Sequence, residues 1–502
     1  KEFVKLEGYS SLLETPFYGK LSGVQKNTYK AFDVLAFYLM SEGSVFGVIQ
    51  EDGILEDKKS DLIRDELYNK FRFHFQFQNE KFLFNEVGHA KRLSVNIFGN
   101  AVTQDISFDH IGNLYLPSTI DVCFQDDLGT EEIPLIKNYL GQWETRGHKS
   151  RIVKIDASAI KLFRDFLNDS ESKSPVFLNI HSSSLLSVIG KISQSKNTFE
   201  TYVGKSNVVG SEMFHETGAQ DKGFIKPSSG RVKTYESLIY TAPQVVAGNP
   251  FSQECQEVYK TKFSYDSVDL EKIDDSFIPR SLFKTDLGND ELDNIFPKLN
   301  GKPYRRHFRL ITRKMVNPTN ERCLFTCIVP PGVMHTHGMT SIALEDSFKL
   351  LVMAGLSSTL LYDGILRLLN KTNISASDFY SFPINADSPF LCSIANRAYS
   401  LNALTSPYQP LKTVLQRAND DSIGNCLGSE IKIIPLKKQE QRTIAQIELD
   451  SLAALSLGLN LDELIQVYKI LFPVLNMYDA KDGFNRAEML SKSYLHFKKR
   501  GW

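Results

Sequence analysis

The sequence lacks a net charge that would attract a polyanion. Its 502 residues include 58 Lys and Arg against 59 Asp and Glu, which leaves a formal net charge of -1 at pH 7. No global field draws the protein to DNA or to a membrane surface, so any nucleic-acid site must be local. Apolar content of 42% and charged content of 23% are those of an ordinary soluble globular protein. The length predicts about two to four domains.

Long hydrophobic runs are also missing. No stretch reaches the roughly 18 to 20 apolar residues of a membrane-spanning helix, and no signal-peptide pattern is present. We therefore expect a cytoplasmic protein without a membrane partner. The chain begins at Lys1 rather than Met, which indicates either processing or a piece of something longer.

Cysteine is sparse and scattered, which argues against a disulfide framework in a chain of this size and favours a reducing compartment. Cys323 and Cys327 precede His335 and His337, so a zinc site is one alternative. Both cysteines lie in an apolar run typical of a buried strand, and buried thiols are the expected outcome. We predict no metal.

Positive charge is concentrated in residues 301–322, GKPYRRHFRLITRKMVNPTNER. Guanidinium groups pair with phosphate oxygens and guanine edges, and interleaved aromatic rings provide stacking faces. The alternative is that these arginines form a solvated helix face or pair with acids elsewhere in the fold. Turn formers at 317–320 end the segment before the apolar run 323–330, which favours rigid presentation to DNA. The predicted DNA contacts are Lys302, Tyr304, Arg305, Arg306, Arg309, Arg313, Lys314, Asn320 and Arg322.

Helix and strand patterns alternate in the first 125 residues. Residues 28–40 and 60–71 have apolar residues at helical spacing, and residues 44–50, 72–78 and 92–98 are typical of strands. This order predicts an α/β fold with a doubly wound, Rossmann-like sheet.

The rest of the chain divides into two regions with different sequence patterns. Residues 126–340 consist of short strand-like pieces between Gly, Pro, Asn and Ser, which predicts a mixed α+β domain. Residues 341–502 are mostly helical by their periodicity, beginning with a long apolar segment at 342–369 that Gly355 and Gly364 are expected to interrupt.

Two places suggest catalysis. Glu51, Asp52 and Gly53 follow the first predicted strand, where α/β folds place ligands, although no glycine fingerprint precedes them. An ordinary loop is the alternative there. His215 and Glu216 raise the alternative of a hydrolase, but adjacent residues rarely provide the geometry of a catalytic pair, and a DNA-facing loop or ordinary structure is favoured.

Several long strings resemble one family, the large adenine-specific DNA methyltransferases of type IIG and single-polypeptide restriction-modification and phage-defence systems. They are, in chain order, GVQKNTYKAF (23–32), FRFHFQFQNEKFLFNEVGHAKRLSVNIFG (71–99), WETRGHKSRIV (143–153), FHETGAQDKG (214–223), GNPF (248–251), RKMVNPTNERCLFTCIVPPG (313–332) and LGLNLDELIQVYKILFPVLNMYD (457–479). The resemblance covers nearly the whole chain.

The resemblance implies three domains: the C-terminal half of a methyltransferase domain (1–125), a target-recognition domain (126–340) and a helical C-terminal domain (341–502). A complete family member also carries a glycine-containing loop for S-adenosylmethionine and an Asn/Asp-Pro-Pro-aromatic motif that holds the flipped adenine. Neither occurs here, so no catalytic residue is expected in this chain. An N-terminal methylase half, in the same polypeptide or separate, would bind S-adenosylmethionine.

The resemblance further implies that the flipped base rests against Phe84 and His89, with core packing as the alternative for Phe84. Two functions are therefore expected. The first is the DNA-recognition portion of an adenine methyltransferase that binds double-stranded DNA, which the retained methylase strands favour. The second is a non-catalytic specificity subunit that acts with a partner methylase, helicase or nuclease, which the missing motifs favour.

Overall fold

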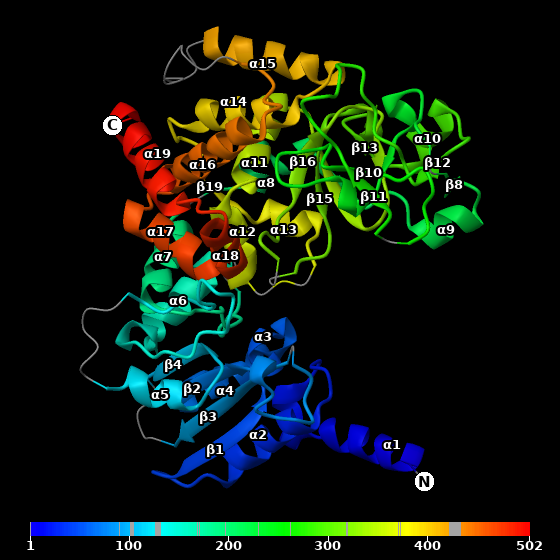
Figure 1. Cartoon of the computed structure of the whole chain (residues 1–502). Helices are drawn as coiled ribbons and strands as arrows, with labels where there is room; N and C mark the ends of the chain where they lie inside the picture. Colours follow the sequence, from blue (N-terminus) through cyan, green and yellow to red (C-terminus); the bar gives the residue numbers. More distant parts are fainter. Residues whose placement is uncertain are drawn as a thin grey trace. The chain divides into compact units, whose positions relative to one another are not determined.

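A computed structural model describes all residues except 1, 90, 101–104, 126–131, 168, 170, 196, 229, 262, 318–319, 370, 372, 421–432 and 502. The chain divides into two compact units (Figure 1). Unit 1 contains residues 1–194 and 469–477, and unit 2 contains residues 195–468 and 478–502. Both units combine helices with sheets, so the chain is a mixed α/β protein.

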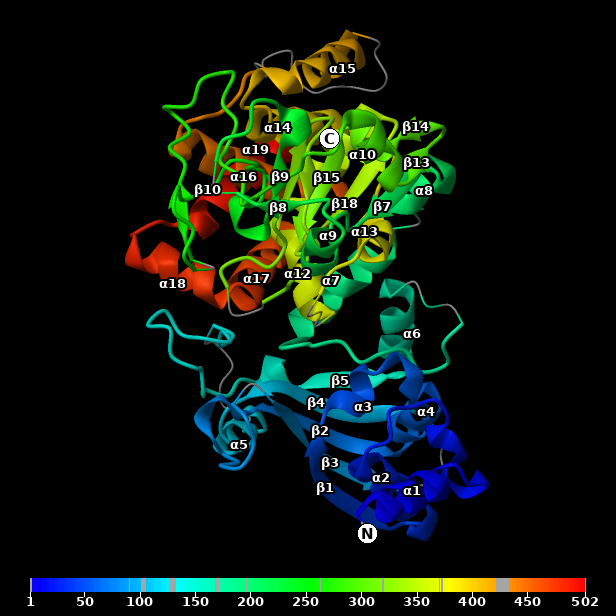
Figure 2. The same ribbon diagram turned by 90° about the vertical axis from the view of Figure 1, so that its right-hand side faces the viewer.

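Unit 1 is built on a five-stranded sheet with the order β1-β3-β2-β4-β5 (Figure 2). Its strands are β1 (Val45–Glu51), β2 (Phe71–Gln78), β3 (Arg92–Gly99), β4 (Ser107–Leu114) and β5 (Val153–Asp156). The first three confirm the strands predicted from the sequence. Only β2 and β4 pair in parallel, whereas the other three pairings are antiparallel.

The prediction of a doubly wound sheet is corrected at β3. The described residues between β2 and β3 form only a short 3-10 turn, η3 (Asn79–Lys81), and a parallel return requires a longer crossover. β3 therefore runs antiparallel to both of its neighbours, and β1 and β2 point in the same direction. Helices α3 (Gly53–Glu56) and α4 (Asp61–Lys70) connect β1 to β2, so one βαβ connection of the predicted pattern is present, with β3 between its strands.

Helix α2 (Thr28–Leu39) confirms the predicted helix before β1 and packs on the sheet. Its Phe37 ring lies 6.5 Å from Phe46 of β1 and 5.0 Å from Phe98 of β3, between ring centroids. The other helices of this unit are α1 (Glu2–Leu13), η1 (Pro16–Leu21), η2 (Lys58–Ser60), α5 (Ser118–Cys123), η4 (Lys149–Arg151), α6 (Ala157–Phe166) and α7 (Ser183–Ser193).

The boundary predicted near residue 125 is also corrected, because residues 132–194 belong to unit 1. β5 pairs with β4, and the buried Arg151 guanidinium donates to the carbonyl oxygens of Gly112 (2.8 Å) and Asn113 (3.1 Å). These backbone contacts tie the WETRGHKSRIV segment to the sheet. Local composition gave no sign of them.

Unit 2 contains a four-stranded antiparallel sheet with the order β16-β15-β18-β7. These strands are β7 (Val208–Ser211), β15 (Arg309–Arg313), β16 (Thr326–Val329) and β18 (Met339–Leu344). β16 confirms the strand predicted in the apolar run 323–330. The domain boundary predicted at residue 340 falls inside β18, which pairs with β15 and β7, so it does not separate domains.

The predicted helix 342–369 is wrong at its start and at its break. Residues up to Leu344 belong to β18, and α11 (Ser347–Ser357) and α12 (Leu360–Leu368) follow, separated at Ser358 and Thr359 rather than at a glycine. Thr359 caps α12, since its side chain accepts from the Tyr362 backbone N–H, and the Asp450 carboxylate accepts a 2.6 Å hydrogen bond from the Leu360 backbone N–H.

The helical character of the last third is confirmed by α13 (Ala376–Tyr380), α14 (Leu391–Asn402), α15 (Gln409–Asp420), α16 (Gln439–Ser456), α17 (Leu461–Leu471), α18 (Pro473–Lys481) and α19 (Arg486–Gly501). The shorter elements that complete unit 2 are β6 (Asn197–Thr198), α8 (Phe199–Val203), η5 (Lys205–Asn207), α9 (Glu216–Asp221), β8 (Lys226–Pro227), η6 (Tyr235–Ser237), β9 (Ile239–Tyr240), η7 (Ala242–Gln244), β10 (Gln253–Cys255), β11 (Tyr265–Ser267), β12 (Phe283–Lys284), α10 (Asn289–Ile295), β13 (Lys298–Leu299), β14 (Lys302–Pro303), η8 (Tyr304–Arg306), β17 (Met334–His335), β19 (Pro383–Ile384) and η9 (Ser406–Tyr408).

A search of the described residues finds no single helix that is both long and apolar enough to cross a membrane. α11 and α12 satisfy that test only together, as a pair bent by 67°. Their leucines, such as Leu350 and Leu366, are fully buried in the core of unit 2.

Candidate nucleic-acid interface

The basic segment 301–322 lies largely inside unit 2. The central residues of this segment form η8 and β15. Tyr304, Arg305 and Arg309 are all 0% exposed. A guanidinium in the core is inaccessible to a phosphate, so the predicted DNA contacts by these three residues are corrected to structural roles. The alternative reading of the sequence, in which the arginines pair within the fold, describes what is observed.

Arg305 and Arg306 share one carboxylate. Arg305 Nε donates to Asp293 Oδ1 at 2.5 Å, and Arg306 Nε donates to Asp293 Oδ2 at 2.8 Å. Arg305 also donates to the Asn289 side chain and to the Gly332 carbonyl oxygen. These two ion pairs fix α10 against η8, although the Arg306 side chain remains 36% exposed.

Arg309 and Arg313 are held by aromatic rings and backbone carbonyl groups. Arg309 donates to the Val333 carbonyl oxygen and lies 5.3 Å from the centroid of the Tyr304 ring. Arg313 Nε donates to the Val245 carbonyl oxygen at 2.8 Å. Burial lowers the pKa of both guanidinium groups to about 10, and the predicted DNA contact by Arg313 is corrected to packing inside the fold.

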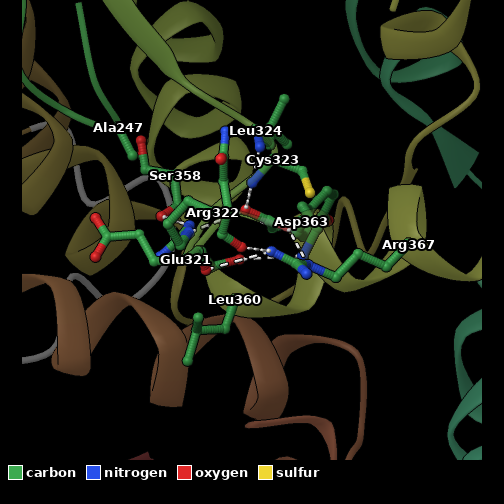
Figure 3. A network of polar contacts seen from close by, with 12 residues as sticks. Ala247, Glu321, Arg322, Cys323, Leu324, Ser358, Leu360, Asp363 and Arg367 are labelled. Carbon is green, nitrogen blue, oxygen red and sulfur yellow. Dashed lines mark hydrogen bonds and ion pairs between the residues drawn. The ribbon is translucent and has the colours of Figure 1, made fainter. Parts of the chain in front are cut away.

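Arg322 belongs to the network drawn in Figure 3, which centres on Asp363 of α12. Asp363 accepts 3.0 Å hydrogen bonds from Arg322 Nε and Arg367 Nε. It also accepts from the backbone N–H groups of Cys323 (2.7 Å) and Leu324 (3.1 Å). Burial opposes ionisation of Asp363, but the charges of Arg367 and Arg322 outweigh it and hold the pKa below its ordinary value. The predicted DNA contact by Arg322 is therefore corrected to a structural ion pair.

Six of the predicted contacts are not fully buried. Lys302 and Asn320 are exposed, and Arg306, Arg313, Lys314 and Arg322 are half-buried. The turn formers Pro318 and Thr319 lie outside the described residues.

Lys314 takes part in a surface cluster with Glu212 and two histidines. Lys314 Nζ donates to Glu212 Oε1 at 2.6 Å, and His337 Nε2 lies 2.9 Å from Glu212 Oε2. The His215 ring lies 5.3 Å from the His337 ring, and His215 Nδ1 accepts the Gly218 N–H as the cap of α9. His215 is therefore committed to a helix terminus, which gives the hydrolase alternative no support.

The loop 256–264 between β10 and β11 exposes apolar side chains. Phe263 is 79% exposed and Val258 is 65% exposed, and Lys260 is also exposed. Ser264 Oγ braces the loop by accepting from the backbone N–H groups of Lys260 (3.2 Å) and Thr261 (3.0 Å). Sequence reasoning missed this loop, although VYKTKF interleaves aromatic and basic residues there. An apolar tip beside a cation is the composition of side chains that enter between base steps.

The loop after β2 contains the predicted base pocket. Phe84 is half-buried, and its backbone N–H and carbonyl groups each bond to the Asn79 side chain at 3.0 Å. His89 is exposed and lies 3.5 Å from Glu80. The ring beside His89 is that of Phe82, with centroids 6.2 Å apart, and Phe82 is 56% exposed at a left-handed φ of 52°. Phe82 is therefore the more exposed of the two rings and lies next to His89, and the prediction for Phe84 stays a prediction.

Asp52, which follows β1, is buried in a chain of hydrogen bonds. Asp52 Oδ1 lies 3.0 Å from His74 Nε2, and His74 Nδ1 lies 3.0 Å from His110 Nδ1. His110 Nε2 contacts the Ile180 carbonyl oxygen, so it donates there and its Nδ1 accepts from His74. Burial lowers the pKa of His110 to about 3, which keeps this ring neutral. Asp52 is thus committed to the interior, whereas Glu51 is half-buried and Gly53 is exposed.

The cysteines of the zinc alternative are buried in unit 2. Burial raises the pKa of the Cys323 thiol to about 12 and also raises that of Cys327. His335 is buried as well, and its Nε2 lies 2.6 Å from Ser341 Oγ. In the described part of the chain, no three His, Cys, Asp or Glu side chains are grouped so that they can hold a metal ion.

Comparisons with known proteins give little further guidance. No protein-family model and no curated protein matches the chain. The type IIG restriction endonuclease BpuSI is a similar solved structure at 10% identity and a TM-score of 0.25, with 84% of this chain and 52% of that chain covered. The type IIL restriction-modification enzyme MmeI in complex with DNA is similar at 10% identity and a TM-score of 0.29, with 97% and 55% covered. The chain spans about half the length of these enzymes, and at such TM-scores the likeness supports no conclusion about this protein.

Proposed function

We propose that the chain is the DNA-recognition and C-terminal portion of an adenine-specific DNA methyltransferase from a restriction-modification or anti-phage defence system. The observation that carries the proposal is the braced loop 256–264, which exposes Phe263 and Lys260 within the segment that resembles a target-recognition region. An exposed aromatic ring at the tip of a loop can stack on a base.

The proposed mechanism uses the accessible groups of each unit. In unit 2, Lys260 pairs with a phosphate while Phe263 and Val258 enter the base stack, which costs a few kcal/mol of unstacking energy. Lys302, Arg306, Lys314 and Asn320 supply further contacts to the DNA backbone. In unit 1, Phe82 and His89 offer a stacking face and a polar group to an extruded adenine.

S-adenosylmethionine supplies the methyl group in such an enzyme, and this sequence lacks the glycine-containing loop that binds it in the family. The strings nearest to the adenine-binding motif are Asn249-Pro250-Phe251 and Ser406-Pro407-Tyr408. Asn249 Oδ1 accepts the Phe251 backbone N–H at 2.9 Å, and Phe251 is 0% exposed, so this amide closes a buried turn. The cofactor and the catalytic motif therefore belong to an N-terminal half, in cis or in trans.

A second candidate function is a non-catalytic DNA-binding subunit that sets specificity for a partner methylase, helicase or nuclease. The same turn at Asn249 favours it, because this amide oxygen is already bonded to the Phe251 backbone N–H and does not serve as an acceptor for an adenine amino group. Both functions require binding to double-stranded DNA.

The test has two measurements. Duplex binding is measured by fluorescence anisotropy, and N6-methyladenine is quantified in genomic DNA from cells with and without the gene. Binding together with a loss of N6-methyladenine on disruption supports the methyltransferase. Binding with unchanged N6-methyladenine favours the specificity subunit, and the absence of duplex binding at low salt contradicts both.

A further inference from the structure

A short hairpin of unit 1, residues 137–143, exposes two large side chains at its tip. Leu140 is 82% exposed and Tyr139 is 53% exposed. Single apolar side chains are common on protein surfaces, so their exposure alone assigns no role to them. The support of this hairpin, its place on the sheet and the charges beside it are what indicate a function.

The turn at the tip is closed by its own hydrogen bonds. The Asn138 backbone N–H donates to the Gln142 carbonyl oxygen, and the Gly141 N–H donates to the Asn138 carbonyl oxygen, both at 2.9 Å. The side-chain oxygen of Asn138 accepts from the N–H groups of Leu140 and Gln142, both at 3.0 Å. Gly141 has a left-handed φ of 77°, which glycine adopts without strain. Leu140 is therefore presented on a backbone with a defined conformation.

The root of the hairpin is anchored where β4 ends. Lys137 and Trp143 form an antiparallel bridge there, and the Lys137 ammonium lies 4.0 Å from the centroid of the Trp143 ring. That ring stacks on Tyr115, with centroids 4.8 Å apart, and Tyr115 directly follows β4. The hairpin therefore starts at the edge of the sheet that holds the carboxyl end of β4.

The proposed base-stacking residues lie at the same edge. β2 and β4 are neighbouring parallel strands, with Phe77 opposite Leu114 at their carboxyl ends. The loop that carries Phe82 and His89 follows β2, and its Leu83 packs against the core cluster that contains Leu114. Carboxyl ends of parallel strands are where α/β folds bind their ligands. The hairpin and the stacking face thus arise side by side.

Positive charge accompanies the hairpin. Between residues 133 and 150 the basic residues are Lys137, Arg146 and Lys149, and the one acidic residue is Glu144. Glu144 is buried, whereas the Arg146 side chain that pairs with it is 62% exposed, and Lys149 is exposed. Exposed cations around an apolar tip suit a duplex, because the cations pair with phosphates while the apolar side chain enters between base steps.

We propose that Leu140 is a wedge, a side chain that enters the duplex and fills the space left by the target adenine when this base is extruded towards Phe82 and His89. Tyr139 stacks on a flanking base, and the cations beside the hairpin pair with neighbouring phosphates. The inference rests on the proposed function for DNA as the occupant. Leu140 is a positioning residue, since it touches the neighbouring base pairs and not the reacting amino group.

The test uses a duplex in which one nucleotide is replaced by an abasic tetrahydrofuran residue. This duplex already contains the gap that the wedge fills, and it needs no pocket for a base, so the 502-residue chain is sufficient. Fluorescence anisotropy compares its affinity with that of the intact duplex of the same sequence. We expect the wild type to bind the abasic duplex at least about tenfold more tightly, because no base has to be unpaired and unstacked.

Three variants show whether the preference belongs to Leu140. Leu140→Ala is expected to remove most of the preference for the abasic duplex, because alanine is too short to fill the gap. Leu140→Met keeps an apolar side chain of similar volume and is expected to retain it. The matched control Leu62→Ala, at a leucine 59% exposed in α4 of the same unit, is also expected to retain it.

Other outcomes separate this inference from the proposed function. Binding of the wild type to both duplexes with equal affinity overturns the wedge alone. If Leu140→Ala lowers both affinities by the same factor, Leu140 is a groove contact and the wedge is overturned. A preference that Leu140→Ala keeps and Phe263→Ala loses assigns the wedge to unit 2 and also overturns the inference. The absence of binding to either duplex at low salt contradicts the proposed function, and the inference falls with it.

Discussion

The guanidinium group of Arg313 lies 4.3 Å from the centroid of the Phe325 ring, inside unit 2. Arg313 is in β15, and Phe325 directly precedes β16, the strand that pairs with β15. A planar cation over an aromatic face is favourable, and it allows a charged residue to enter the core without a carboxylate partner. The high density of basic residues in the segment 301–322 therefore reflects side chains that pack inside the fold more than a surface that binds DNA.

Arg305→Ala is expected to destabilise the protein rather than to weaken its DNA contacts. The substitution removes one of the two arginines that pair with Asp293 and the buried partner of Asn289, and loss of one member of a buried ion pair costs up to about 3–5 kcal/mol. Urea denaturation measures the change. Lys302→Ala, at an exposed lysine of the same segment, is the control and is expected to leave the unfolding free energy within about 0.5 kcal/mol.

The same variants separate structure from DNA binding. The salt dependence of duplex binding by folded Arg305→Ala is expected to equal that of the wild type. A slope that is smaller by about 0.9 in the log-log plot would mean that Arg305 contacts a phosphate and that the structural assignment is wrong.

Asp363 is expected to make stability fall in acid. Its pKa is held below the ordinary value in the folded state, so its contribution is complete above the pKa of the unfolded chain and is lost as the pH falls through the folded value. Unfolding free energies from pH 7 to pH 3 test this. Asp363→Asn removes that part of the pH dependence and lowers stability at pH 7, and an unchanged pH profile in the variant contradicts the assignment.

Asp33 is expected to make the stability of the protein fall as the pH rises, the opposite of the effect of Asp363. Burial raises its pKa to about 7, with a 3.1 Å hydrogen bond from Gln50 acting against that change. The folded state therefore binds a proton more tightly than the unfolded chain, and stability falls as the pH rises from about 4 to 7, by at most about 1.4 kcal/mol per pH unit. Asp33→Asn keeps the shape and removes the titration.

Denaturation of the wild type and of Asp33→Asn at pH 5 and pH 8 tests whether Asp33 titrates in the folded protein. We expect the variant to gain stability relative to the wild type at pH 8. An equal difference between the proteins at both pH values would show that Asp33 does not titrate in this range.

Phe263→Ala is expected to weaken duplex binding by about 1–3 kcal/mol, the usual cost of removing a stacking ring, without changing the salt dependence. Lys260→Ala is expected to reduce the log-log salt slope by about 0.9. Tyr478→Ala, which removes an aromatic ring 43% exposed in α18, is the matched control. Equal affinities for wild type and Phe263→Ala remove the loop from the interface.

Much of the secondary structure was predictable because its signals are local. α2, α4, β1, β2, β3 and β16 all lie within a few residues of their predicted ranges, since hydrophobic periodicity is set by neighbours along the chain. The segment 342–369 failed for a non-local reason. Its apolar residues are buried on all sides, so periodicity could not distinguish β18 from helix. The start of α12 is bonded both by the local cap Thr359 and by Asp450, about 90 residues away.

The candidate site was less predictable. Phe82 and Phe84 are two residues apart in a loop of similar composition, and the Asn79 side chain, by bonding the backbone of Phe84, decides which ring is exposed. Composition also could not indicate that Phe263 is exposed, because that depends on how Ser264 closes the β10–β11 loop.

The sequence by itself determined the mixed α/β character, the order of the main helices and strands, and the absence of the recognised cofactor motifs, because each is encoded in consecutive residues. Only the tertiary structure decided which charged side chains are exposed to solvent and so available to a DNA phosphate. Arg305, Arg309, Arg313 and Arg322 look alike in the sequence as cations beside aromatic and polar residues. Whether each one meets solvent or a buried acid, ring or carbonyl group depends on residues far away in the chain, such as Asp293, Val245 and Asp363. Burial is a property of the packed units, and the linear pattern does not contain it.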